Sequence, residues 1–101
     1  MMENEHKHDK PNYIAVIPSN VRCDKRLKAN EKLLYSEITA LISNIGYCEK
    51  NDSYFADLYN VSRKTISRWI KNLSDLGYIQ LVTISEENNV VVNKRRIFVK
   101  K

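Results

Sequence analysis

The residues best suited to chemistry lie in one run, residues 60–79, which reads NVSRKTISRWIKNLSDLGYI. The run combines the hydroxyls of Ser62, Thr65 and Ser67 with a series of cations. Those cations are Arg63, Lys64, Arg68 and Lys71. Guanidinium, ammonium and hydroxyl groups all donate hydrogen bonds to oxygen acceptors, and the charged donors form the stronger bonds. The run therefore predicts binding to an anionic surface that is rich in acceptors.

Catalytic and metal-binding patterns are missing from the sequence. The carboxylates are scattered, and none has a histidine partner in the part of the chain that is expected to fold. His6 and His8 lie in a charged N-terminal stretch, where two ligands make a weak metal site. Cys23 and Cys48 fit no metal spacing, and we expect buried, reduced thiols rather than a disulfide. We therefore expect a protein that is not an enzyme, with no metal, no cofactor and no small-molecule ligand.

A helix over residues 62–76 is predicted to position the cations. Ser62 is a suitable N-cap, because its hydroxyl can accept a hydrogen bond from the N–H group of Lys64 or Thr65. At 100° per residue, three apolar side chains fall within about 60° of Ile66, and most of the cations fall on the opposite side. The apolar three are Trp69, Ile70 and Leu73, so Trp69 is expected in the core rather than stacked on a base. Gly77 supplies the left-handed residue that ends a helix.

Two further helices are predicted before this one. The first runs from residue 29 or 30 to residue 44 and has an apolar stripe followed by Gly46 as a stop signal. Its stripe comprises Leu34, Ile38, Leu41, Ile42 and Ile45. The second begins at Asn51 or Ser53 and ends near Tyr59. Only two residues, 60 and 61, then separate it from Ser62, and this short spacing is typical of a helix-turn-helix.

The sequence after Gly77 predicts a β-hairpin. Residues 78–85 and 90–101 are rich in β-branched and aromatic side chains, and the polar residues 86–89 lie between them. The second arm carries Lys94, Arg95 and Arg96. Because side chains alternate along a strand, at least one of the two arginines is expected to point outward. Residues 47–49 could add a short strand.

The rest of the chain completes one domain. Residues 1–12 are polar and lack a period, so we expect a disordered tail. Residues 13–17 are apolar and are expected to lie extended on the domain, and residues 20–28 are expected to form a loop from which Val21 and Leu27 dock inward. A chain of 101 residues supports one core. The predicted organisation is a tail over residues 1–12 and a single domain over residues 13–101.

The charge is concentrated in the C-terminal part. The chain has a net charge of +5, and residues 60–101 hold nine basic and three acidic side chains. This asymmetry predicts a polyanionic partner, and nucleic acid is favoured over a membrane because no basic helix with a bulky apolar face is left over. Without a membrane span or a secretory signal, the expected location is the cytoplasm.

The order of helices, short turn, basic helix and basic hairpin predicts an α+β winged helix-turn-helix with three helices and a C-terminal wing. It resembles the N-terminal winged-helix domains of phage and plasmid replication initiation proteins of Gram-positive bacteria, of the DnaD-like and RepA types. The resemblance rests on six segments and covers nearly the whole chain after residue 13. They are IPSNV (17–21), LKANEKLLY (27–35), GYC (46–48), NDSYFADLYNVSRKTISRWIKNL (51–73), LGYI (76–79) and RRI (95–97).

The resemblance implies binding to double-stranded DNA, with the helix over residues 62–76 in the major groove and the hairpin of residues 78–101 as a wing. The residues placed to contact bases are Arg63, Lys64 and Ser67. The residues placed to contact the DNA backbone are Ser62, Thr65, Arg68, Lys71, Lys94, Arg95 and Arg96.

Other functions share parts of this pattern. Basic residues on an exposed helix face are often only a solvated surface, although here they coincide with a capped helix and a basic hairpin. A small transcriptional regulator would bind DNA in the same way. A protein-interaction module would instead use the helix or the wing for assembly, and the apolar residues 13–17 and 90–92 leave room for the interface of a homodimer.

Overall fold

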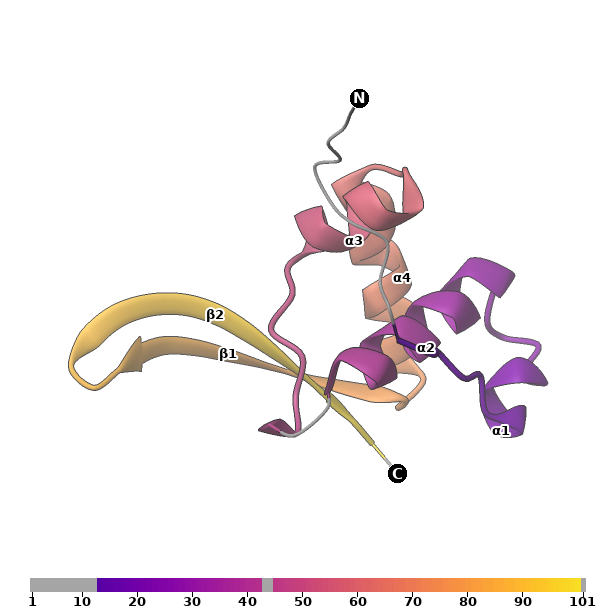
Figure 1. Cartoon of the computed structure of the whole chain (residues 1–101), viewed down its shortest axis with the longest axis horizontal. Helices are drawn as coiled ribbons and strands as arrows, with labels where there is room; N and C mark the ends of the chain where they lie inside the picture. The colour runs from indigo at the N-terminus through magenta and orange to yellow at the C-terminus, as the bar shows by residue number, and fades with distance from the viewer. Residues whose placement is uncertain (1–12, 43–44, 101) are drawn as a thin grey trace.

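The computed structural model describes residues 13–42 and 45–100. The predicted tail, with its two histidines, and the predicted end of the first long helix at residue 44 lie outside these residues. The elements follow in the order α1 (Ser19–Arg22), α2 (Ala29–Ile42), α3 (Asp52–Tyr59), α4 (Arg63–Asp75), β1 (Ile79–Glu87) and β2 (Val90–Val99). The helices gather on one side, and the hairpin of β1 and β2 extends away from them (Figure 1). The predicted α+β winged helix-turn-helix fold is confirmed.

The core forms where α2, α3 and α4 meet the base of the hairpin. Ile38 of α2, Phe55 of α3 and Ile66 of α4 are all fully buried. The whole predicted apolar face of α4 is buried, including Trp69, whose ring meets that of Tyr59 edge-on at 6.2 Å. Burial of this face orients α4 so that its opposite, basic face is exposed to solvent.

The turn between α3 and α4 depends on two local features. Asn60 adopts the left-handed conformation with φ of 58°, which asparagine tolerates better than most residues. Ser62 then caps α4, and its hydroxyl accepts a hydrogen bond from the backbone N–H group of Thr65 at 3.1 Å. Asn51 caps α3 in the same way through Tyr54. Both predicted caps are confirmed, and the short turn fixes the start of α4 beside α3.

The turn of the hairpin is tighter than the sequence indicated. The strands pair antiparallel from Ile79 with Val99 out to Glu87 with Val90, with one irregularity between Ile84 and Glu86. Only Asn88 and Asn89 form the turn, and both have positive φ, the conformation of the tight turns that suit hairpins. The predicted four-residue break is therefore wrong, because Glu86 and Glu87 lie in β1 despite their low strand propensity.

The base of the hairpin is attached to the preceding loop. Cys48 and Ile97 exchange backbone hydrogen bonds of 2.9 and 2.8 Å, so the predicted strand near residues 47–49 is a single bridge. On the other side, the Tyr78 hydroxyl donates to the carboxylate of Asp24, which also pairs with Arg26. These hydrogen bonds lower the pKa of Asp24 well below its usual range, so the carboxylate is charged where it braces the start of the wing.

Several predictions outside the motif need correction. Residues 19–22 form the one-turn helix α1 within the predicted loop, although Val21 and Leu27 are buried as expected. Ile45 is 61% exposed and does not continue the stripe of α2, because the described helix ends before it. Cys23 is exposed rather than buried, and both cysteines are free.

Residues 13–17, which were expected to lie extended on the domain, contact it only through the first and the last residue of the segment. The Tyr13 hydroxyl donates to Glu37 and the Ile17 side chain packs against the core, whereas Ile14 and Val16 are exposed. Within residues 13–42 and 45–100, none of the helices combines the length and the apolar character that a membrane span requires.

Candidate nucleic-acid interface

The exposed face of α4 carries cations that the fold does not neutralise. Arg63, Lys64 and Arg68 are exposed, and within residues 13–42 and 45–100 no ion pair to a carboxylate involves any of them. Lys71 differs, because its ammonium group lies 2.7 Å from Asp75, one turn later on the same helix. The free positive charge of α4 is therefore concentrated in its first half.

The first turn of α4 has no acidic residue. The N-terminus of a helix carries a partial positive charge and favours anions, so Arg63 and Lys64 at this end oppose the helix dipole. Lys64 and Arg68, four residues apart, also repel each other. The fold gains nothing from these charges, whereas an anion brought to this turn would meet both the cations and the free N–H groups of the helix.

Ser62 and Thr65 keep one hydroxyl proton available for a ligand. The Ser62 oxygen already accepts the cap hydrogen bond, and the two hydroxyl oxygens lie 2.9 Å apart. One of the two hydroxyl groups donates its proton to the other oxygen. The second hydroxyl group can then donate its own proton to a ligand. The pair is suited to a phosphate oxygen that approaches the start of α4.

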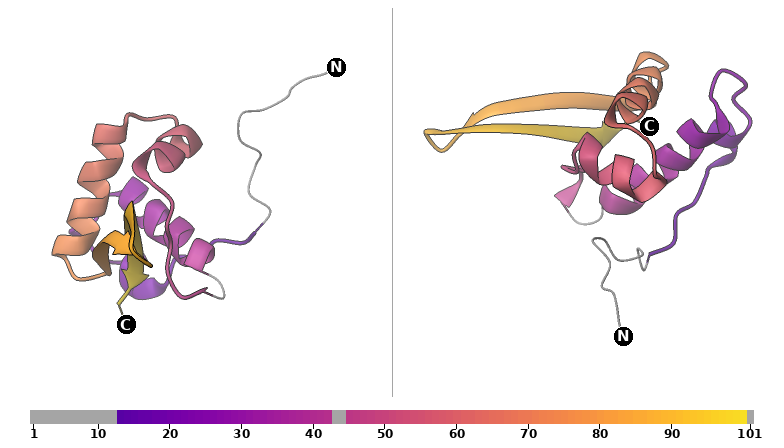
Figure 2. Two further views of the ribbon diagram at one scale, coloured as in Figure 1. Left: turned by 90° about the vertical axis from the view of Figure 1, so that its left-hand side faces the viewer. Right: turned by 90° about the horizontal axis from the view of Figure 1, so that it is seen from above.

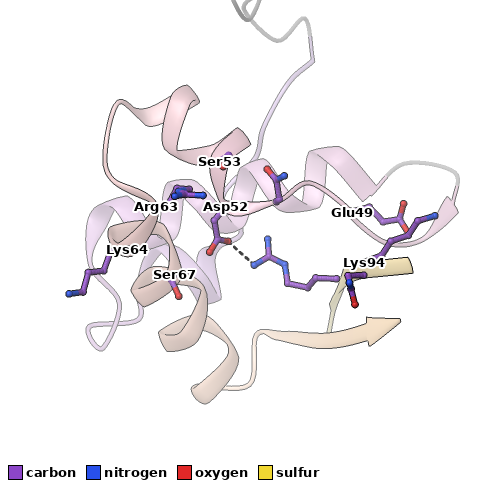
Figure 3. A pocket seen from close by; sticks show the side chains of 10 residues that line it. Glu49, Asp52, Ser53, Arg63, Lys64, Ser67 and Lys94 are labelled. Atoms are coloured by element: carbon purple, nitrogen blue, oxygen red, sulfur yellow. Dashed lines mark hydrogen bonds and ion pairs between the residues drawn. The ribbon is translucent and has the colours of Figure 1, made fainter. Parts of the chain in front are cut away.

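A groove of about 800 Å³ lies between the first half of α4 and the second strand of the wing. Its walls are Arg63, Lys64 and Ser67 on α4 and Asn93, Lys94 and Arg95 on β2. Its floor is formed by the loop before α3 and the first turn of α3, through Glu49, Asn51, Asp52 and Ser53. In Figure 3, Asp52 lies between Arg63 and Lys94. The three residues predicted to contact bases thus share one groove with two of the predicted wing cations.

The predicted wing cations differ from the cations in the first half of α4, because each wing cation has a carboxylate partner. Lys94 lies 3.5 Å from Glu87 across the hairpin and is 44% exposed. Arg95 pairs with Asp52 at 2.7 Å, and Arg96 pairs with Glu49 at 2.8 Å and stacks over Tyr47. The hydrogen bond with Glu49 raises the pKa of Arg96, which stays charged. The side chains of both arginines are only about a quarter exposed or less. The expectation that at least one of them would point freely outward is therefore wrong.

The other residues that were predicted to contact the DNA backbone lie outside the groove. Ser62, Thr65, Arg68, Lys71 and Arg96 do not line it. The acidic and amide residues of its floor and the wing residue Asn93 were missed in the sequence. Of the floor residues, Asn51 and Ser53 had a signal, as candidate caps of α3, whereas Glu49 and Asp52 reach the groove through tertiary packing. In the described residues no group of side chains could hold a metal ion.

Comparison with known proteins agrees with this geometry. A family described as helix-turn-helix domain matches residues 25–79, from the turn before α2 to the first residue of β1, and the rest of the wing lies beyond the match. Neither the curated proteins nor the solved structures gave a significant match. The matched residues are more than half of the chain and contain all three helices of the motif, so the chain belongs to the helix-turn-helix domain family.

Proposed function

We propose that the chain is a sequence-specific binding module for double-stranded DNA, with α4 in the major groove and the hairpin against the flanking backbone. The observation that carries the proposal is the exposed pair of Arg63 and Lys64 in the first turn of α4, without carboxylate partners in the described residues. Cations at the N-terminus of a helix interact unfavourably with the helix dipole, so these two side chains destabilise α4. Their presence there favours a role in binding rather than in folding. In helix-turn-helix proteins the N-terminal residues of this helix are those that reach base edges.

The proposal divides the contacts by the chemistry of the side chains. Arg63 and Lys64 suit the O6 and N7 acceptors of guanine, and Ser67 lies one turn later in the same groove. Contacts with phosphates fall to Ser62, Thr65, Arg68, Lys71 and Lys94, which position the helix without reading the sequence. The same role for Arg95 and Arg96 stays a prediction, and their ion pairs with carboxylates of the chain compete with it. The module acts by binding and not by catalysis.

A matched pair of double variants tests the proposal. Replacing Arg63 and Lys64 with glutamine removes two charges from the groove, and replacing Lys25 and Lys28 with glutamine removes two exposed charges near the start of α2. We expect the first variant to lose most of its affinity for a duplex and the second to bind like the wild type. The logarithm of the association constant should fall with the logarithm of salt concentration by roughly 0.9 for each neutralised phosphate, so the first variant should also show a shallower slope.

Fluorescence anisotropy with a labelled duplex at several salt concentrations measures both quantities. Absence of wild-type binding even at low salt would refute the proposal. Equal losses for the two double variants would show that net charge rather than α4 attracts the duplex.

We further propose that the module serves replication initiation in a phage or plasmid, and a transcriptional regulator with the same mode of binding is the alternative. Support for the first comes from the resemblance of residues 17–21, 27–35 and 51–73 to replication initiation proteins. Selection of bound duplexes from a random pool gives the target sequence. A target repeated within a replication origin supports initiation, and one at a promoter supports regulation. A palindromic target would indicate a homodimer, for which the exposed Ile14, Val16, Val90 and Val91 offer apolar surface.

A further inference from the structure

Three consecutive wing residues bind the segment that leads into α3. The Arg95 guanidinium donates to Asp52 and to the backbone carbonyl of Lys50, the Arg96 guanidinium donates to Glu49, and Ile97 exchanges two backbone hydrogen bonds with Cys48. The described residues of the outer hairpin have no comparable attachment to the helices, and the right-hand view in Figure 2 shows the hairpin extending away from them. Residues 95–97 therefore hold the β2 side of the wing base against the segment before α3.

Arg95 makes the attachment that lies closest to the groove. Its two terminal nitrogens donate to two different acceptors, the Asp52 carboxylate at 2.7 Å and the Lys50 carbonyl at 2.9 Å, so the planar guanidinium is held in one orientation. Its Nε atom is buried and has no hydrogen-bond partner in the described residues. Asp52 is the first residue of α3, where a carboxylate also interacts favourably with the helix dipole. Figure 3 shows this ion pair as the dashed line at Asp52, inside the groove.

The pair contributes little charge to a DNA-binding surface. Asp52 cancels the charge of Arg95, and a phosphate that approached Arg95 would also approach the Asp52 carboxylate. The neighbouring Lys94 is more exposed and has a looser partner, at 3.5 Å. Of these two wing cations in the groove, Lys94 is thus the one suited to a phosphate.

We propose that Arg95 is a positioning residue, which holds the wing at a set angle to α4 so that Lys94 and the first turn of α4 face the same duplex. The inference rests on the proposed DNA-binding function. If Arg95 positions the wing, Asp52 favours DNA binding by holding Arg95 in place, even though the Asp52 carboxylate itself repels DNA. If Arg95 were instead a phosphate ligand, Asp52 would weaken DNA binding, because it would compete with the phosphate for Arg95.

The two roles predict opposite results for the variants. If Arg95 positions the wing, Arg95→Gln and Asp52→Asn each weaken binding to the target duplex, by roughly 3- to 30-fold, and the double variant is no weaker than the weaker single variant. Arg95→Gln then also withdraws Lys94 from its phosphate, so the salt slope falls, and adding Lys94→Gln lowers it no further. If Arg95 binds phosphate, Arg95→Gln and Lys94→Gln each lower the slope by roughly 0.9, their combination lowers it by roughly twice as much, and Asp52→Asn tightens binding. Lys94→Gln is the matched control on the adjacent residue and should lower the slope.

A second measurement tests the wing angle without DNA. Spin labels on cysteines introduced at the exposed positions Asn30 and Glu86, in a Cys23→Ser background, report the distance from the start of α2 to the outer wing by double electron–electron resonance. Arg95→Gln should broaden or shift the distance distribution, and Lys94→Gln should leave it unchanged. Circular dichroism confirms that each variant is folded.

The combined outcomes separate the inference from the proposed function. A moved wing, weaker binding by Asp52→Asn, and a combined Arg95→Gln and Lys94→Gln variant with the slope of Lys94→Gln alone support the positioning role. An unmoved wing, additive losses of slope in that combined variant, or tighter binding by Asp52→Asn each overturns it. If the wild type binds no duplex, the proposed function fails, while the distance measurement still decides whether Arg95 sets the angle of the wing.

Discussion

Arg63 and Lys71 lie on the same helix and carry the same charge, yet their surroundings differ. Arg63 is the first residue of α4, lines the groove and has no carboxylate partner in the described residues. Lys71 lies two turns later, outside the groove, and pairs with Asp75. A guanidinium at the start of the helix can make two hydrogen bonds with one guanine, whereas Lys71, outside the groove and paired with Asp75, is placed to attract only the backbone.

Substitution of these two residues should therefore have different effects. Arg63→Ala should weaken binding to the target duplex by about 1–3 kcal/mol and relax the preference at one base pair. Lys71→Ala should weaken binding to target and random duplexes alike, by a smaller amount, because Asp75 already offsets part of its charge. Anisotropy titrations of both variants on both duplexes measure the effect. Parallel losses on the two duplexes for Arg63→Ala would contradict its assignment to base reading.

The helix α4 combines a buried apolar face with an N-terminal turn whose charges oppose the helix dipole. The apolar face and the Ser62 cap stabilise the helix, and Arg63 and Lys64 destabilise it. A turn that needed only to fold would be better served by acidic residues. Stability and binding should therefore change in opposite directions when a charge in this turn is reversed.

Lys64→Glu tests this opposition. The new carboxylate interacts favourably with the helix dipole and with Arg68 four residues later, so the free energy of unfolding should rise by about 0.5–1 kcal/mol, while DNA binding is lost. Lys71→Glu is the control with the same change of charge: it removes the ion pair with Asp75 and should lower stability. Urea denaturation gives the free energies. A loss of stability in Lys64→Glu would show that Lys64 supports the fold.

The wing and the helices share one core. Ile97 is fully buried although it belongs to β2, and its backbone bonds to Cys48 close the sheet onto the loop before α3. Ile79, at the start of β1, is buried in the same core. The base of the wing is thus part of the domain, whereas the outer hairpin is exposed, with Val91 80% accessible to solvent.

Two substitutions on β2 should separate these parts. Ile97→Ala leaves a cavity between the wing and the helices and should lower the free energy of unfolding by about 2–5 kcal/mol. Val91→Ala, near the tip of the same strand, should change it by less than about 0.5 kcal/mol. Urea denaturation followed by tryptophan fluorescence and by far-ultraviolet circular dichroism should give one coincident transition for the wild type. Separate transitions would show that the wing unfolds independently of the helices.

Local features of the sequence were enough to predict the motif. The spacing of Ile66, Trp69, Ile70 and Leu73, the cap at Ser62 and the stop at Gly77 all act within a few residues, and the structure agrees with each of them. Local features were less informative where the intrinsic preference of a residue conflicts with its place in the fold, or where an element is very short. Glu86 and Glu87 lie in a strand, and α1 is too short to show a period.

The amphipathic character of α4, with one apolar and one basic face, follows from helical periodicity and capping, which depend on near neighbours. Which cations stay free depends instead on how distant parts of the chain pack together. Arg95 meets Asp52 across 43 residues, and Arg96 meets Glu49 across 47. The positive charge that appears concentrated in the C-terminal part of the chain is thus partly neutralised by carboxylates from the N-terminal part. Ion pairs depend on distance in space, and packing of the wing against the loop before α3 sets that distance.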